Sequence, residues 1–169
     1  MALPNVVTEQ HDLLTLNTNK LPFIKNAILD GVDVKPLFLD AQNGIWVLLA
    51  TFAPGVTLPM HFHTGTVHAW TLSGLWHYLE YPDQPQTAGC YLYEPGGSVH
   101  QFHTPESNTE DTTFFMVVTG ANVDFDANAE FQGIMDAGAI EAMLLKLAAE
   151  QGLGTPRYIR SRGAAFSTD

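Results

Sequence analysis

Residues 55–103 read GVTLPMHFHTGTVHAWTLSGLWHYLEYPDQPQTAGCYLYEPGGSVHQFH, and this stretch holds six of the seven histidines of the chain. Its only carboxylates are Glu80, Asp83 and Glu94. Neutral imidazole is the commonest side-chain ligand for metals in proteins. A concentration of histidines among so few carboxylates therefore indicates a metal site. The six histidines are His61, His63, His68, His77, His100 and His103.

The spacing of three of these histidines suggests that they meet. His61 and His63 are two residues apart, and residues two apart on a strand point to the same face of a sheet. His100 follows the turn sequence Pro95-Gly96-Gly97, after which a new strand can begin. Any one histidine taken alone is more often a hydrogen-bonded core residue. The pair together with a third histidine behind a turn favours a metal held by His61, His63 and His100 inside a β-barrel.

Short apolar runs separated by turn sequences continue from residue 34 to residue 125. Gln42-Asn43-Gly44 lies between two such runs, and Asn-Gly in that position is a strong hairpin signal. The run 45–50 is apolar on both faces, which indicates that both are covered. Closely spaced short strands predict an antiparallel sandwich or barrel. The predicted strands are Val34–Asp40, Ile45–Phe52, Val56–Phe62, Val67–Leu72, Leu75–Tyr81, Gly89–Tyr93, Val99–His103, Thr112–Thr119 and Asn122–Phe125.

A helical pattern follows the strands. Asp136 can cap a helix that runs from about Ala137 to Gln151, and two glycines after it can end the helix. A single amphipathic helix after a barrel most simply packs against the outside of the barrel or closes one mouth. The apolar stripe of this helix consists of Ile140, Met143, Leu144 and Leu147.

Composition narrows the class of protein. A chain of 169 residues with 46% hydrophobic and 15% charged residues predicts one globular domain. The net charge of −11 argues against nucleic acids and anionic membranes as partners. A single cysteine, Cys90, excludes an internal disulfide and suits a reducing compartment. The first residues lack the pattern of a signal peptide and no apolar run is long enough to span a bilayer, so a cytoplasmic location is expected.

Two segments resemble the paired motifs of the cupin superfamily. Gly55, His61-Phe62-His63, His68 and Gly74 are spaced like the first motif. Gly89, Pro95-Gly96-Gly97 and His100 are spaced like the second. Two departures are that His68 stands where the family usually has Glu and Thr104 where it usually has Asn. The resemblance implies an all-β fold, the cupin double-stranded β-helix or jelly-roll barrel, with one C-terminal α-helix. It divides the chain into an N-terminal arm at 1–20, a cupin barrel at 21–135, and a helix and tail at 136–169.

Within the cupins the amino-acid sequence is most similar to small non-haem iron dioxygenases of the 2,4'-dihydroxyacetophenone dioxygenase type, and more distantly to acetylacetone dioxygenases. The similar segments are HFHTGTVH, EYPDQPQTAGCYLYEPGGSVHQF and DAGAIEAM. The resemblance implies Fe(II), with Zn, Ni or Mn possible in purified protein. It implies O2-dependent cleavage of a C–C bond in an α-hydroxyketone, to an aromatic acid and formate, or in a β-diketone. It also implies a homodimer or homotetramer.

Two further residues are candidates for the site. His68 occupies the position of the usual metal-binding Glu, so it is either a fourth ligand or a residue that hydrogen-bonds a ligand or the substrate. Glu80 would share a strand face with Trp76 and Tyr78, and a buried carboxylate needs a cation. We expect Glu80 to bind the metal, and Glu80 and His68 to be the catalytic residues. Regular alternation turns His77 and His103 away, and Glu94 reads as a loop or salt-bridge residue.

Two other classes of function fit the same pattern. A metal-dependent isomerase or lyase on this barrel would also bind a hydroxyketone or a sugar, but it would not consume O2. A non-catalytic cupin would bind a small molecule without turnover. Oxygen uptake by iron-loaded protein distinguishes the dioxygenase from both.

Overall fold

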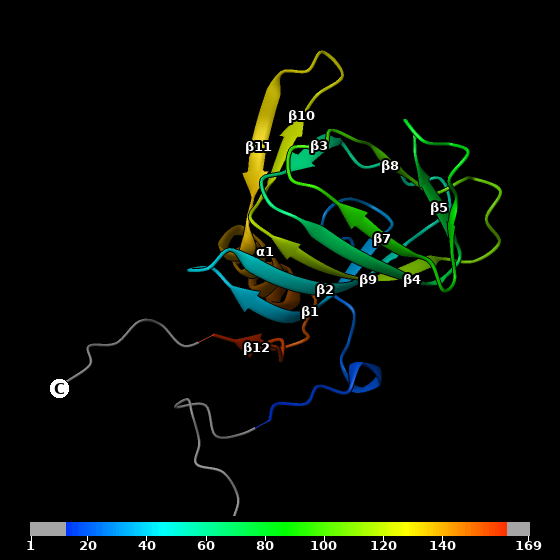
Figure 1. Ribbon diagram of the computed structural model, residues 1–169. Coiled ribbons are helices and arrows are strands. Elements are labelled where there is room, and N and C mark those ends of the chain that lie inside the picture. The colour runs from blue at the N-terminus through cyan, green and yellow to red at the C-terminus, as the bar shows by residue number, and fades with distance from the viewer. Residues whose placement is uncertain (1–12, 162–169) are drawn as a thin grey trace, which may run out of the picture.

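The computed structural model describes residues 13–161 as three antiparallel sheets followed by one helix (Figure 1). The large sheet has the order β12-β1-β2-β9-β4-β7, and the two small sheets have the orders β11-β10-β3 and β6-β5-β8; only β12 runs parallel to its neighbour. The predicted all-β jelly-roll barrel with a C-terminal helix is therefore confirmed. The strands are β1 (Val32–Asp40), β2 (Ile45–Phe52), β3 (Met60–His63), β4 (Val67–Ser73), β5 (Leu75–Tyr78), β6 (Gln86–Thr87), β7 (Tyr91–Glu94), β8 (Phe102–His103), β9 (Thr112–Thr119), β10 (Asn122–Phe125), β11 (Phe131–Met135) and β12 (Ile159–Arg160).

The hairpin between β1 and β2 forms where the Asn-Gly pair predicts it. Gly44 has a φ of +65°, a conformation that costs glycine little, and the Asp40 carboxylate accepts hydrogen bonds from the backbone N–H groups of Gln42 and Asn43. Along β2 buried and half-buried residues alternate strictly. One face of this strand thus lies in the barrel and the other faces outward.

The core of the barrel is aromatic. Phe52 stacks on Phe114 with ring centroids 4.9 Å apart, and Trp76 lies 4.9 Å from Phe102. The indole N–H of Trp76 donates to the Thr71 hydroxyl over 2.9 Å, so this buried polar group has a partner. Burial of side chains of this size stabilises the fold by about 1.5–3 kcal/mol each.

The helix α1 (Ala137–Glu150) begins where the Asp136 side chain accepts a hydrogen bond from the backbone N–H of Ala139 over 2.8 Å. The buried stripe of the helix includes Ile140 and Leu144, which also line the internal cavity of the barrel. The helix therefore closes one end of the barrel, behind β1 and β2 in Figure 1. Hydrogen bonds between Gln151 and the backbone of Lys25 hold its C-terminal end.

Several predicted boundaries differ from the structure. The strand predicted at 75–81 ends at Tyr78, because the backbone N–H of Tyr81 turns back to the carbonyl of Tyr78 over 2.9 Å, just before Pro82. Strand β3 begins only at Met60, after Pro59. Strands β6, β11 and β12 were not predicted, since none has a clear apolar alternation.

The predicted arm at 1–20 falls partly outside the described residues, which begin at Leu13. Its described part ends in a short 3-10 helix, Thr18–Lys20, and the Lys35 ammonium group donates to the carbonyl of Thr18 over 2.8 Å. This contact lays the segment against β1 of the same chain. Among the described residues no helix is long and apolar enough to cross a membrane.

Candidate metal centre

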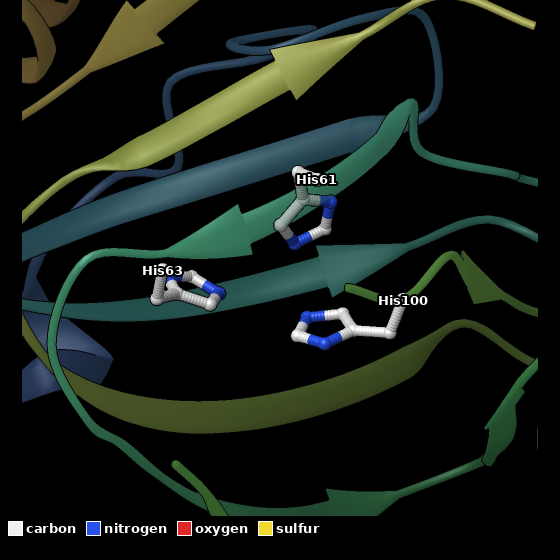
Figure 2. A group of neighbouring side chains, drawn as sticks. All are labelled: His61, His63 and His100. Atoms are coloured by element: carbon white, nitrogen blue, oxygen red, sulfur yellow. The ribbon is translucent and has the colours of Figure 1, made fainter. Parts of the chain in front are cut away.

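The side chains of His61, His63 and His100 converge inside the barrel (Figure 2). Each offers a ring nitrogen, and these three nitrogens lie within 4.8 Å of one another. All three residues are buried. Buried imidazoles converging in this way can coordinate one metal ion.

Backbone pairing fixes two of the three histidines directly opposite each other. The N–H of His61 donates to the carbonyl of His100 over 3.0 Å, and the N–H of His100 donates back over 2.9 Å. The carbonyl of His63 accepts from the N–H of Gly97 over 2.8 Å, at the Pro-Gly turn. The geometry of the group thus depends on the sheet and the turn rather than on flexible loops.

The protonation of His61 is set by its backbone partner. Its Nδ1 lies 2.8 Å from the carbonyl oxygen of Pro59, and a carbonyl can only accept. The neutral ring therefore carries its proton on Nδ1 and leaves the Nε2 lone pair free for a metal. Burial is the main cause that lowers the pKa of His61, which keeps the ring neutral.

Glu94 is the site residue that the sequence analysis missed. Its Oε2 lies 3.3 Å from Nε2 of His63 and 3.3 Å from Nε2 of His100, while its Oε1 accepts a hydrogen bond from the Tyr78 hydroxyl. Glu94 ends β7 and pairs with the buried Val67 of β4, so it faces inward. The signal was present in the strand pattern, because Glu94 is two residues from the inward Leu92.

The polar atoms of this group fit a cation. Within the described chain, Nε2 of His100 and Oε2 of Glu94 are buried without a hydrogen-bond partner, and Nε2 of His63 lies 3.3 Å from the same Oε2. Buried polar atoms are rarely left unpaired, and a coordinated ion satisfies lone pairs of this kind. Three imidazoles beside one carboxylate are a donor set for a divalent transition metal.

The protein environment prepares these groups for a metal. Burial lowers the pKa of His63 to about 3 and that of His100 to about 4, so both rings are neutral at pH 7. Burial also raises the pKa of Glu94 to about 7, against the opposing effect of the Tyr78 hydrogen bond. A carboxyl group with that pKa can take up or release a proton near neutrality.

The structure does not bring Glu80 into this group. Glu80 is exposed, and its Oε2 accepts a hydrogen bond from the backbone N–H of Gln101 over 2.9 Å. The reason is the early end of β5 at Tyr78, after which the chain turns and the alternation that linked Glu80 to Trp76 and Tyr78 no longer holds. Glu80 is therefore not among the converging ligand residues, although, next to the larger effect of burial, its charge acts to raise the pKa of both His61 and Tyr78; its expected catalytic role stays a prediction.

His68 also lies apart from the other three. Its neighbours Val67 and Ala69 are buried in the barrel, so His68 points to the outer face of β4. Its Nδ1 lies 2.7 Å from the hydroxyl of Tyr91 on the same outer face. His68 therefore does not lie with His61, His63 and His100, either as a fourth ligand or as a catalytic residue. As predicted, His77 and His103 also lie outside the site, as a cross-strand pair with ring centroids 5.3 Å apart.

A small cavity adjoins the histidines, and a larger cleft is lined by one of them, His61. The cavity has a volume of about 60 Å³ and is lined mainly by apolar side chains, together with His61, His63 and Glu94. The cleft, of about 760 Å³, shares His61 with the cavity. Ligand pockets for drug-sized molecules are typically about 300–1,000 Å³. The cleft can therefore hold an organic ligand, and the cavity only a small group at its end.

Two polar side chains of β10 lie beside the histidines: Asn122 borders both spaces and Asp124 borders the cleft. Asn122 pairs with His63 and Asp124 pairs with His61 in the register of β10 with β3. The Oδ1 of Asn122 is buried without a hydrogen-bond partner in the described chain, and Asp124 lines the cleft. Burial raises the pKa of Asp124, although His61 acts in the opposite direction. These two residues are polar groups that a ligand in the cleft would meet beside His61.

Comparison with known proteins agrees with this fold. The family described as the ChrR Cupin-like domain matches residues 11–123. A protein of unknown function with a cupin-like fold from Ralstonia eutropha JMP134 is 47% identical, with 96% of this chain and 100% of that chain covered and a TM-score of 0.89. An RmlC-like cupin from the same organism is 25% identical, with 90% and 96% covered and a TM-score of 0.79.

A third solved structure resembles the chain in fold alone. It is an acetylacetone dioxygenase from Acinetobacter johnsonii, 16% identical, with 87% of this chain and 99% of that chain covered and a TM-score of 0.68. No curated protein matches the sequence.

Proposed function

The chain belongs to the ChrR cupin-like family, and from that premise we propose that it is a non-haem Fe(II) dioxygenase that cleaves a C–C bond of a small ketone. The substrate class is an α-hydroxyketone of the 2,4'-dihydroxyacetophenone kind, or a β-diketone. The observation that carries the proposal is the convergence of three buried neutral imidazoles, one of which, His61, also lines a cleft large enough for an aryl ketone.

The metal would be held by His61, His63 and His100. Three neutral ligands leave the charge of a divalent ion uncompensated, which favours a bidentate anionic oxygen ligand such as an enediolate or a diketonate. When bound, Fe(II) would bring the electron-rich substrate and dioxygen together and supply redox chemistry that the side chains lack. Zn, Ni or Mn could occupy the same donors in purified protein.

The chain's own contribution to the chemistry centres on Glu94. A hydroxyketone or a diketone must lose a proton to become the chelating anion, and a carboxylate with a pKa of about 7 is suited to accept it. The Tyr78 hydroxyl holds one oxygen of Glu94 and leaves the other toward the histidines. Glu94 is therefore positioned as the general base.

The shape of the site orients the substrate. The cavity of about 60 Å³ is too small for an aromatic ring but accommodates a chelating head group. The ring would then lie in the cleft, against Leu58, Met60 and Phe125. The apolar walls of the cavity, which include Trp46 and Phe102, exclude water from the reacting end.

The balanced reaction takes one hydroxyketone and one O2 to a carboxylic acid and formate. The bond between the carbonyl carbon and the hydroxymethyl carbon breaks, and each carbon gains one oxygen atom. Dioxygen is the oxidant, so no further reductant is needed. Ferrous iron and a single cysteine both suit a reducing compartment such as the cytoplasm.

The experiment is anaerobic loading of the protein with Fe(II), followed by oxygen uptake with a panel of hydroxyketones and diketones. With ¹⁸O2, we expect one labelled oxygen in each product. The control is the His100→Ala variant, which should consume no oxygen. Conversion of substrate without oxygen uptake would indicate an isomerase or lyase, and binding without conversion would indicate a non-catalytic cupin. Either result would overturn the proposal.

A further inference from the structure

A separate cleft of about 410 Å³ lies on the outer side of β1. Val34 of β1 lines the internal cavity, whereas the next residue, Lys35, lines this cleft, because neighbouring residues of a strand point to opposite faces. The other walls come from the segment before β1 and from the segment after α1, drawn in blue and in orange below β1 in Figure 1. We call it the basic cleft, and it is lined by residues 15–17, 20–22, 24, 35–36, 153 and 155–157.

The cations that line the basic cleft differ from the other cations of the chain in their lack of an ionic partner. The chain has 18 Asp and Glu residues and only 7 Lys and Arg, yet Lys20, Lys35 and Arg157 line this cleft and no Asp or Glu does. None of the three forms an ion pair within residues 13–161. The other three cations of that range each do: Lys25 with Asp33, Lys146 with Glu150 and Arg160 with Glu141. In so acidic a chain, a basic cleft without a carboxylate indicates that an external anion supplies the negative charge.

Lys35 is the cation for which the missing partner costs most, because its residue is only 8% exposed. Its ammonium group donates to the carbonyl of Thr18 over 2.8 Å and lies 4.0 Å from the ring centroid of Phe23. A lysine ammonium has three N–H donors, and a buried charge is costly unless it is paired. Burial lowers the pKa of Lys35, as expected for a cation with no anion beside it. A bound anion would accept a further hydrogen bond here and offset the cost of burial.

The walls between the cations are apolar. They include the side chains of Leu21, Pro36 and Leu153. Inorganic phosphate is commonly held by backbone N–H groups, but positions 22, 36 and 156 of the lining are prolines, which have none. Pockets for organic ligands are typically about 300–1,000 Å³, so the volume of the basic cleft is large enough for one. The lining therefore suits an anion that carries its charge at one end of an apolar body.

We propose that the basic cleft binds a small organic carboxylate, with its charged group on Lys35 and Arg157 and its apolar body on the leucine and proline side chains. A guanidinium group can bind a carboxylate through two parallel hydrogen bonds. The ligand would join the segment before β1 to the segment after α1, which hydrogen bonds of 2.9 and 2.8 Å between Lys25 and Gln151 already connect. The basic cleft shares no lining residue with the cavity or the cleft at the histidines, so this site does not depend on the metal or on the proposed reaction.

The test is calorimetric titration of the metal-free full chain with benzoate and with hexanoate at constant ionic strength. Each carboxylate is compared with its neutral amide, benzamide or hexanamide, and with inorganic phosphate. We expect one carboxylate site per chain, and affinities for the amides and for phosphate that are weaker by about tenfold or more, the contribution of a hydrogen bond between charged groups. Absence of binding by both carboxylates would overturn the proposal, as would equal binding of an amide or of phosphate.

Substitutions locate the site. Lys20→Gln and Arg157→Gln change exposed side chains and should each weaken carboxylate binding several-fold while the fold is kept. Lys35→Met keeps the apolar stem of the side chain and removes its charge, and should weaken binding by about tenfold or more. The matched control is Lys146→Gln, which changes the net charge equally at an exposed position of α1 outside the basic cleft and should bind like the wild type. Wild-type affinity in both Lys20→Gln and Arg157→Gln would contradict the proposal.

The His100→Ala variant separates this site from the candidate metal centre, where a carboxylate could also bind. In metal-free protein, His100→Ala should bind benzoate and hexanoate as tightly as the wild type. Loss of binding in His100→Ala, together with unchanged binding in Arg157→Gln, would place the carboxylate at the histidines and refute the site in the basic cleft. Neither result bears on the proposed dioxygenase activity, which oxygen uptake by the iron-loaded protein measures separately.

Discussion

Oε2 of Glu94 lies 3.3 Å from Nε2 of His100 and 3.3 Å from Nε2 of His63, and neither Oε2 nor the His100 nitrogen has a hydrogen-bond partner among the described residues. Buried polar atoms without hydrogen bonds are rare, and a cation held by the histidines would stabilise the carboxylate beside it. The Tyr78 hydroxyl fixes the other carboxylate oxygen, and the Tyr78 ring centroid lies 4.4 Å from that of His100. Tyr78, Glu94 and His100 therefore form one packed unit beside the candidate metal position.

Replacement of Glu94 by Gln should lower activity while preserving the fold. The amide keeps an oxygen that can accept the Tyr78 hydrogen bond, but it removes the negative charge and the proton acceptor. Partners of metal ligands typically contribute about 10–100-fold to metal affinity or activity, and we expect a decrease in kcat/KM of that order. Steady-state oxygen uptake and iron content measure the two effects separately.

Glu80→Gln is the matched control for this variant. Glu80 is exposed and accepts only the backbone hydrogen bond of Gln101, so iron content and kcat/KM should stay close to those of the wild type. An equal loss in Glu80→Gln and Glu94→Gln would contradict the placement of Glu94 at the site.

Removal of any one histidine of the group should abolish iron retention. His61→Ala, His63→Ala and His100→Ala each leave two protein imidazoles, which hold a divalent ion far more weakly than three. His68→Ala should retain iron, because His68 lies on the outer face of β4. Metal analysis after gel filtration checks this, and full iron content in any of the first three variants would refute the ligand assignment.

The metal-free protein should lose stability as the pH falls below neutrality. Burial lowers the pKa of His63 to about 3 and of His100 to about 4, from an ordinary value of 6.5, so the unfolded chain binds protons that the folded chain does not. Their contribution to stability is complete above pH 6.5 and is lost as the pH falls toward 4. Each such proton changes the free energy of unfolding by about 1.4 kcal/mol per pH unit.

Glu94 acts in the opposite sense over part of this range. Its pKa is raised from 4.5 to about 7, so the stability that its protonation contributes is present below pH 4.5 and is lost as the pH rises through 7. Two histidines outweigh one carboxyl group, so the metal-free wild type should still weaken on acidification from pH 6.5 to 4.5. Glu94→Gln should show a steeper decline, and urea unfolding at a series of pH values measures both slopes. A slope unchanged by the substitution would show that Glu94 is not buried with a raised pKa.

Asp124 should discriminate against anionic substrates. Its carboxylate lines the cleft opposite His61, and a carboxylate on the substrate ring would be repelled there. Asp124→Asn should therefore lower KM for a carboxylated aryl ketone several-fold, with little change in KM for the neutral parent compound. The same KM ratio for the two ketones in wild type and variant would exclude this role.

Much of the barrel could be predicted from local patterns. The Asn43-Gly44 turn and the cap at Asp136 each depend on residues close in sequence, and the observed elements match these predictions closely. The positions of His61, His63 and His100 could also be predicted, because a two-residue spacing and a turn determine the faces on which they lie.

The carboxylate beside the three histidines could not be predicted from the sequence in the same way. Glu80 and Glu94 both lie in or next to a short strand, and each was compatible with the site if its strand remained regular. The sequence therefore determined the three histidines and the barrel that holds them, through periodicity and turn chemistry. Only the tertiary structure decided that Glu94 faces inward and Glu80 outward, because that choice depends on where β5 ends and on the pairing of Glu94 with Val67 across the sheet.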